Sequence, residues 1–348
     1  MRKLTFTLLL CLTLVACDKA LLEETLDNTP QQNFQLFWDD FDQHYGLFQV
    51  RNHNWDSIYT AYQPLINDST TDDQLWSYFT EMIAYLDDSH TVLYHPSKDI
   101  EFESGSLENE QAEQVFSLNL VTQKYLEDVQ TLNLVEEENH LYGKVKNRNI
   151  GYIHFSDFEM TESSFFDIVL EDLQAVDALI FDLRNNTGGV DEIAAEIAGR
   201  FVNEEQFVYT VQTKNGINPN DFTPKTKYFS KKVGSQNFSK PVILLTDKIT
   251  VSTAEVFTIY MKSFPLVTQI GDVTAGDFSS IGMRRFLPNG WQYQYSIMMY
   301  LLPDGSSLDG IGHIPSISIK NTVTDIQSQT DNVLEEAFSF LFSEYGIE

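Results

Sequence analysis

Hydrophobic residues recur along the chain with two different periods. Between residues 34 and 86 they return every three or four positions, which is the period of a helix with one buried face. The first such stripe consists of Phe34, Phe37, Trp38, Phe41, Tyr45 and Phe48. Further helices are predicted over 55–66 and from the capping signal TTDD at 70–73 onward. We interpret the aromatic stripes as the core of a small helical N-terminal domain, residues 31–98.

After residue 149, short apolar runs alternate with amphipathic segments. The predicted strands are 149–155, 178–183 and 241–247, and the predicted helices are 163–176, 190–201 and a segment that opens at Ser252. Continuous apolar runs of this kind are typical of strands buried on both faces. Strands that alternate with helices indicate crossover connections, so residues 149–348 are predicted to form an α/β core with a mostly parallel sheet.

The segment 99–148 between these two parts is acidic. Its alternating pieces VFSLNLV (115–121) and HLYGKVK (140–146) predict short strands. We therefore expect a β-rich connector there.

The first 17 residues, MRKLTFTLLLCLTLVAC, have a basic start and an apolar run too short to span a bilayer. This pattern predicts an export signal. The ending LVAC resembles the lipobox of bacterial lipoproteins, which implies cleavage before Cys17, acylation of Cys17, and a tether over residues 18–30. The alternative is an ordinary signal peptide in which the cysteine has no role. The lipobox reading predicts a lipid-anchored protein of the cell envelope.

The formal net charge of the chain is −29. A field of this sign repels nucleic acid and anionic lipid headgroups, so no nucleic-acid partner is expected and membrane contact is expected through the lipid anchor only. The one other cysteine, Cys11, lies in the predicted signal, so the mature chain is expected to contain no internal disulfide.

Two predicted strand-to-helix loops carry residues suited to chemistry, since ligands bind beyond the carboxyl ends of parallel strands. The loop DLRNNTGG (182–189) ends in Gly188 and Gly189, which permit close approach of a substrate to bare amides. The loop TDKITVSTAEVF (246–257) places Ser252 at a helix start, where the Thr253 amide can stabilise an oxyanion. The simpler alternatives are that the first loop is only a tight strand-to-helix turn, and that Ser252 in the second loop is only an N-cap residue.

Five motifs, taken in order, resemble the tail-specific or C-terminal processing serine peptidase family, including its tricorn-like branch. They are DLRNNTGG, PVILLTD, VSTAEVF, GDVTAGD (271–277) and LDGIGHIPSI (308–317). The resemblance implies a crotonase/ClpP-like spiral core, a peptide or protein substrate, no cofactor, and Ser252 as the nucleophile. About 50 residues separate the DDSHT element from the first core strand, which is too few for a PDZ domain, so none is expected.

The resemblance also bears on the base that activates Ser252. The processing-peptidase branch uses a lysine in its Gly-x-x-Thr-x-Gly-Lys stretch, where this chain has Asp277. The tricorn-like branch uses a histidine preceded by a serine, and LDDSHTVL (86–93) supplies His90 and Ser89. The catalytic tetrad of this branch, Ser–His–Ser–Glu, ends in a glutamate. Asp309 stands at the place of that glutamate and has a side chain shorter by one methylene. An imidazole is a competent base near neutral pH, so we expect His90 to act on Ser252, supported by Ser89 and Asp309.

The sequence therefore predicts a serine peptidase that works through an acyl-enzyme, with an oxyanion hole made by the amides of Thr253 and of Gly188 or Gly189. The main alternative is a catalytically inactive surface lipoprotein that uses the same fold as a peptide-binding module, and the change to Asp309 is its chief support. A third alternative is a crotonase-like hydratase that acts on thioesters.

Overall fold

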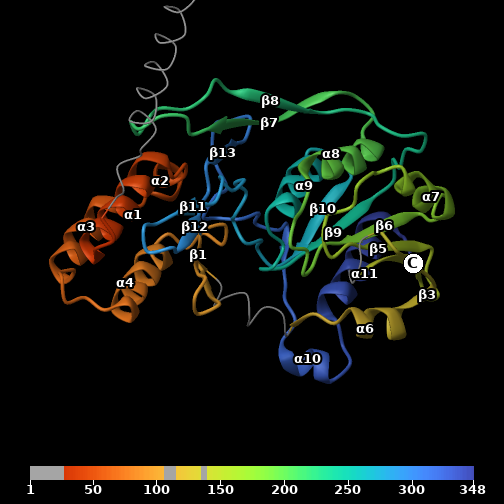
Figure 1. Ribbon diagram of the computed structural model, residues 1–348. Helices are drawn as coiled ribbons and strands as arrows, with labels where there is room; N and C mark the ends of the chain where they lie inside the picture. Colours follow the sequence, from red (N-terminus) through yellow and green to blue (C-terminus); the bar gives the residue numbers. More distant parts are fainter. Residues whose placement is uncertain (1–26, 106–114, 135–138) are drawn as a thin grey trace, which may run out of the picture.

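The computed structural model describes residues 27–105, 115–134 and 139–348, with a group of helices beside a larger α/β body (Figure 1). The predicted signal with Cys17, most of the tether and part of the acidic connector lie outside the described residues. Within the described ranges, no helix has both the length and the apolar character that a bilayer crossing requires.

The first four helices follow the predicted N-terminal pattern. They are α1 (Pro30–His44), α2 (Phe48–Arg51), α3 (Trp55–Tyr62) and α4 (Asp72–Ala84). The first stripe spans two helices because the chain turns at Gly46, where a Cβ atom would lie 2.7 Å from the backbone of Ile297. Helix α4 begins as the capping signal indicates, with Thr71 and Gln74 forming a reciprocal capping box.

The aromatic core of these helices is shared with the C-terminal half of the chain. The ring of Phe37 lies 4.3 Å from that of Phe79 and 5.0 Å from that of Tyr293. A small sheet has the order β11-β12-β1-β2. Its strands are β1 (Val92–His95), β2 (Ile100–Glu103), β11 (Arg285–Phe286) and β12 (Gln292–Gln294). The predicted helical domain therefore does not close around a core of its own, and His90, between α4 and β1, is held against the body.

The large sheet has the strand order β14-β10-β9-β6-β5-β4-β3. These strands are β3 (Leu126–Leu132), β4 (His140–Val145), β5 (Ile150–His154), β6 (Ala178–Asp182), β9 (Val242–Thr246), β10 (Val267–Gly271) and β14 (Ile317–Ser318). From β14 to β5 every pair is parallel, whereas β4 and β3 are added antiparallel. This confirms the predicted mostly parallel α/β fold.

The acidic segment differs from its prediction in two ways. Strands β3 and β4 extend the large sheet instead of forming a separate connector. The piece VFSLNLV is wrongly predicted as a strand: it forms the short helix α6 (Leu118–Leu120), which leads into a π-helix over Val121–Tyr125. The side chain of Ser117 accepts a hydrogen bond from the Leu120 amide, and such an N-cap favours a helical turn over an extended chain.

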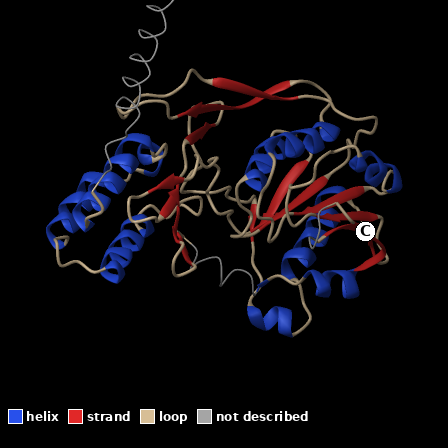
Figure 2. Cartoon of the chain, viewed as in Figure 1, coloured by secondary structure: helices blue, strands red, loops and turns tan. Residues whose placement is uncertain are grey.

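Helices cover both faces of the large sheet (Figure 2). On one face pack α7 (Phe165–Asp172), α8 (Asp191–Ala198) and α9 (Thr253–Lys262), and on the other α11 (Asn332–Tyr345), while α10 (Val323–Gln327) precedes α11. Neighbouring residues of β6 alternate between the two cores, with Phe181 in one and Ile180 in the other. A third sheet, β13-β7-β8, consists of β7 (Gln206–Thr213), β8 (Thr226–Ser230) and β13 (Met298–Leu301).

Candidate active site

Ser252 lies between β9 and α9 in a strained backbone conformation. Its φ of 59° and ψ of −125° are unusual for a residue other than glycine, and such strain is concentrated at functional sites. The Ser252 side chain caps no amide of α9, so the N-cap alternative is not supported. Its Oγ instead lies 3.2 Å from Nε2 of His90, a residue 162 positions away in sequence.

The other imidazole nitrogen of His90 faces Asp88. The Nδ1 atom lies 3.8 Å from Oδ1 of Asp88 and makes no hydrogen bond with any residue in the described ranges. Asp88 is buried, and its Oδ1 accepts hydrogen bonds from the His90 amide at 3.1 Å and from Ser296 Oγ at 3.1 Å. Burial would raise the pKa of Asp88, but Arg51 and His90 hold it below its ordinary value, so the carboxylate stays charged.

Among the residues that the structure describes, Ser89 and Asp309, expected to support His90, make no hydrogen bond to the imidazole. The amide of Ser89 donates to Oδ2 of Asp277 at 3.1 Å. Asp309 is buried, accepts from the Phe278 amide at 3.2 Å and from Ser307 Oγ at 3.3 Å, and burial raises its pKa to about 7. Since no hydrogen bond among the described residues links Asp309 to Ser89 or His90, the carboxylate nearest Nδ1 is Asp88. In the sequence, the one feature that could have pointed to Asp88 is its position two residues before His90.

Arg51, at the end of α2, connects the loop of His90 to the loop over 274–277. Its Nη2 donates to the Gly276 carbonyl at 2.7 Å and to the carboxylate of Asp277, and its Nη1 donates to the carbonyl of Asp87. The Arg51 side chain is only 3% exposed. Burial would lower the Arg51 pKa, but neighbouring anionic groups, Asp88 and Asp277 among them, raise it above its ordinary value. No motif in the sequence pointed to Arg51.

Glu255, the acidic residue of the Ser-x-x-Glu run, organises the same loop from inside. Its carboxylate is buried and accepts hydrogen bonds from Thr274 Oγ1 at 2.5 Å, the Gly276 amide at 2.8 Å and the Asp277 amide at 2.8 Å. Burial raises the pKa of Glu255 to about 8, although these donors oppose the shift. The loop that carries Asp277 is thus fixed to α9, the helix that begins after Ser252.

The glycines of DLRNNTGG divide into two roles. The Gly188 amide already donates to Oδ1 of Asn186 at 2.9 Å, so its expected place in the oxyanion hole is not supported. The amides of Gly189 and Thr253 donate to no acceptor within the described part of the chain. At Gly188, with φ of +93°, a Cβ atom would lie 2.6 Å from Cβ of Ser252. Gly188 therefore provides room for Ser252, and Gly189 and Thr253 are the available donors.

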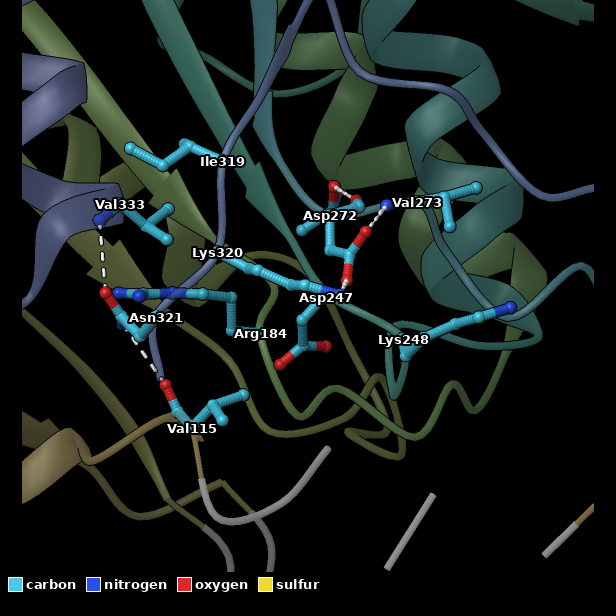
Figure 3. Close-up of a pocket in the computed structure, with 11 residues that line it drawn as sticks. Val115, Arg184, Asp247, Lys248, Asp272, Val273, Ile319, Lys320, Asn321 and Val333 are labelled. Carbon is cyan, nitrogen blue, oxygen red and sulfur yellow. Dashed lines mark hydrogen bonds and ion pairs between the residues drawn. The ribbon is translucent and has the colours of Figure 1, made fainter. Parts of the chain in front are cut away.

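The carboxyl ends of β6, β9 and β10 also line a separate pocket of about 480 Å³ (Figure 3). None of the residues that line it belongs to the Ser252–His90 pair. Arg184 in its wall is buried between two carboxylates, 2.6 Å from Asp182 Oδ2 and 2.9 Å from Asp331 Oδ1, so its charge is already balanced. In the described ranges, no three His, Cys, Asp or Glu side chains are grouped in a way that would hold a metal ion.

The fold and site define an α/β protein with a strained serine that faces a histidine at the carboxyl end of a parallel sheet. Residues 149–319 match the model of peptidase family S41, and residues 26–84 match that of the tricorn protease C1 domain. Residues 149–319 of this chain thus form an S41 peptidase domain, and the chain resembles the tricorn-like branch of that family, as its five motifs indicated.

Similar proteins support this assignment. The carboxy-terminal processing protease CtpB of Bacillus subtilis is 26% identical over 179 residues, which are 51% of this chain and 35% of that protein. The chain thus spans about a third of the length of this relative. A crystal structure of a suspected peptidase from Parabacteroides merdae has a TM-score of 0.78 at 25% identity, and covers 90% of this chain and 97% of its own.

Tricorn protease itself shares the fold. Its crystal structure matches with a TM-score of 0.54 at 16% identity, over 90% of this chain and 36% of tricorn protease.

Proposed function

We infer that this protein is a serine peptidase in which Ser252 attacks a peptide carbonyl and His90 accepts its proton. The observation that carries the proposal is the distance of 3.2 Å between Ser252 Oγ and His90 Nε2, at a serine whose backbone is strained. An alcohol is a weak nucleophile until a base within hydrogen-bond reach takes its proton, and a neutral imidazole can do so.

The surrounding groups are suited to the two halves of an acyl transfer. The amides of Gly189 and Thr253 would hold the developing oxyanion, and Thr253 begins α9, whose N-terminus carries partial positive charge. The imidazolium of His90 would then give its proton to the leaving amine. A water activated by the same imidazole would hydrolyse the acyl-enzyme and regenerate the Ser252 hydroxyl.

Asp88 is the group that we assign to orient His90. A carboxylate beside Nδ1 fixes the tautomer in which Nε2 is the base, and it stabilises the imidazolium. The present gap of 3.8 Å must shorten for a direct hydrogen bond, and catalytic hydrogen bonds often tighten when substrate binds. Arg51 and Asp277 act one step further away, since they hold the loop on which both Asp88 and His90 lie.

A peptide or protein substrate follows from the chemistry and from the names of the relatives. We also propose a lipid anchor on Cys17 in the cell envelope, which rests on the sequence MRKLTFTLLLCLTLVAC alone.

Labelling with a fluorophosphonate probe tests the proposal, because the probe forms a bond only with an activated serine. The wild-type protein should be labelled, Ser252→Ala should not, and His90→Ala should lose most of the signal. His44→Ala removes a histidine on α1 and serves as the matched control. Hydrolysis of a mixed peptide library, measured by mass spectrometry, should follow the same order. Absence of both labelling and hydrolysis, with retained peptide binding, would favour the binding-module alternative.

A further inference from the structure

A cavity of about 570 Å³ lies beside Ser252 and has a wall of tyrosines. Gly189, Ser252 and Thr253 line one part of it. The tyrosines are Tyr209 on β7, Tyr228 on β8, Tyr300 on β13 and Tyr260 on α9. Because Tyr209 pairs with Tyr228, and Tyr300 pairs with Val211, side-chain alternation puts the three strand tyrosines on one face of the small sheet.

Asp191, the first residue of α8, presents a carboxylate to this cavity. Its Oδ1 accepts a hydrogen bond from Thr253 Oγ1 at 2.7 Å, and its Oδ2 accepts one from the Tyr300 hydroxyl at 2.8 Å. Each carboxylate oxygen has a second lone pair, so two acceptor positions remain. Burial raises the pKa of Asp191, and these two donors lower it only in part.

Within the described ranges, no lysine or arginine pairs with the Asp191 carboxylate. Among the described residues Asp191 forms no ion pair, although two lysines line the cavity. The ammonium group of Lys227 lies 5.4 Å from the centre of the Phe207 ring, and that of Lys231 lies 3.8 Å from Oε2 of Glu205. Both lysines thus have partners elsewhere, while the exposed Glu192 adds a second carboxylate to the lining.

We propose that this cavity binds a lysine or arginine side chain of the substrate, on the acyl side of the scissile bond, and that Asp191 selects it. The proposal rests on the peptidase function inferred above. The Gly189 and Thr253 amides would bind the oxygen of the acyl residue, so the side chain of that same residue is the one nearest the cavity. Tyrosine faces attract cations, and a carboxylate with free lone pairs adds a charge-assisted hydrogen bond.

The charge of the whole protein acts in the same direction. With a formal net charge of −29, the chain attracts cationic peptides and repels acidic ones before contact. An aromatic or aliphatic residue could also fill a tyrosine-lined cavity, but it would desolvate the Asp191 carboxylate without supplying a cationic partner, which is unfavourable. Preference for a cation is therefore the outcome that the cavity lining favours.

A set of quenched fluorescent peptides that differ only in the residue before the cleaved bond tests the selection. Peptides with Lys or Arg should be cleaved with kcat/KM at least about tenfold above those with Leu or Phe, and peptides with Glu should be cleaved slowest. Equal or faster cleavage after Leu or Phe would overturn the proposal while leaving the peptidase function intact.

The variant Asp191→Asn removes the charge of the side chain and keeps its shape, because asparagine is nearly isosteric with aspartate. Its side-chain oxygen can still accept the hydrogen bond from the Tyr300 hydroxyl. It should lower kcat/KM for the Lys peptide by roughly tenfold to a hundredfold and change the Leu peptide less than threefold. Glu171→Gln removes one charge from the exposed surface of α7 and is the matched control, with both peptides unchanged. An equal loss for both peptides in Asp191→Asn would overturn the assigned role.

Binding to the Ser252→Ala protein gives a readout that does not need turnover. Calorimetry should show tighter binding of a short peptide that ends in lysine than of its norleucine counterpart, and Asp191→Asn should remove the difference. Equal binding of the two peptides contradicts the cation site. Absence of labelling in the wild type together with lysine-selective binding would instead disprove the peptidase function and keep the site.

Discussion

Arg51 donates to the carboxylate of Asp277, the residue that stands where the processing-peptidase branch has its lysine. The same carboxylate accepts the Ser89 amide, while Arg51 also reaches the carbonyl of Asp87. A position that supplies the base in one branch of the family therefore serves here to hold the loop of His90. The ion pair also balances the charge of the acid that stands at position 277.

Replacing Arg51 should weaken both the fold and the site. Arg51→Met leaves the Asp277 carboxylate buried without a cation, so we expect a loss of about 3–5 kcal/mol in the free energy of unfolding, measured with urea. Displacement of the His90 loop by about 1 Å should lower kcat/KM roughly a hundredfold. Arg285→Met is the matched control, because Arg285 is 43% exposed and its pairing is weak. Similar losses in the two variants would contradict the assigned role of Arg51.

Asp88 and Ser89 can be separated as supports of His90. Asp88→Asn should lower kcat roughly a hundredfold or more with little change in KM, because it disturbs the tautomer and charge stabilisation of the imidazole. Ser89→Ala should change kcat less than about threefold, since Ser89 is held by its backbone amide. Steady-state kinetics on one peptide substrate measures both. A large loss in Ser89→Ala with a small one in Asp88→Asn would restore the arrangement through Ser89 and Asp309.

Gly188 should be far less tolerant of a side chain than Gly290, a glycine with a similar φ. In Gly188→Ala, the added methyl would lie 2.6 Å from Cβ of Ser252, so we expect fluorophosphonate labelling to fall by about a hundredfold or more. Gly290 has φ of +88° but nothing within 4 Å of the added atom, so Gly290→Ala should cost only the backbone strain, of about 1 kcal/mol. Equal labelling of the two variants would contradict the steric explanation.

The stability of the protein should fall as the pH rises from about 6.5 to 8. Burial raises the pKa of Asp309 to about 7 and of Glu255 to about 8. In the unfolded chain these carboxyls are already ionised in this range, so the folded protein binds more protons and loses stability as they dissociate. Below about pH 6.5 the buried His154 and His313 oppose this trend, because burial lowers their pKa values to about 4 and about 3.

Urea unfolding at several values between pH 6.5 and 8 measures this slope. Asp309→Asn removes one of the two carboxyls and should make the decline less steep, whereas Asp304→Asn, at a fully exposed carboxyl, should leave the slope unchanged. Stability that stays constant or rises over this range would show that these carboxyls are not held protonated in the fold.

The proposed lipid anchor can be tested with the two cysteines of the chain. Cys17→Ser should abolish metabolic labelling with an alkyne fatty acid and release the protein from the detergent phase in phase partitioning. Cys11→Ser is the matched control and should keep the label, because Cys11 lies before the proposed cleavage point. Labelling that persists in Cys17→Ser would refute acylation of this residue.

Much of this architecture was readable from local pattern. Continuous apolar runs fixed the identity of β5, β6 and β9, and their alternation with helices predicted parallel pairing, because a crossover through a helix returns the chain in the same direction. VFSLNLV was misread because its apolar alternation also suits a short helical turn capped by Ser117. The order of the motifs identified Ser252 and His90 as candidate site residues without any information on the distance between them.

The remaining features depend on contacts between segments far apart in the chain, which no local pattern encodes. The sequence itself determined β5, β6 and β9, the first helices, and the residues with the chemistry for acyl transfer. Only the tertiary structure decided that Asp88, and not Asp309, lies nearest His90, that the Gly188 amide is occupied, and that Arg51 pairs with Asp277. The physical reason is that a side chain's partners are set by how whole elements pack, and the helices of residues 30–84 pack on a core that residues 287–301 complete.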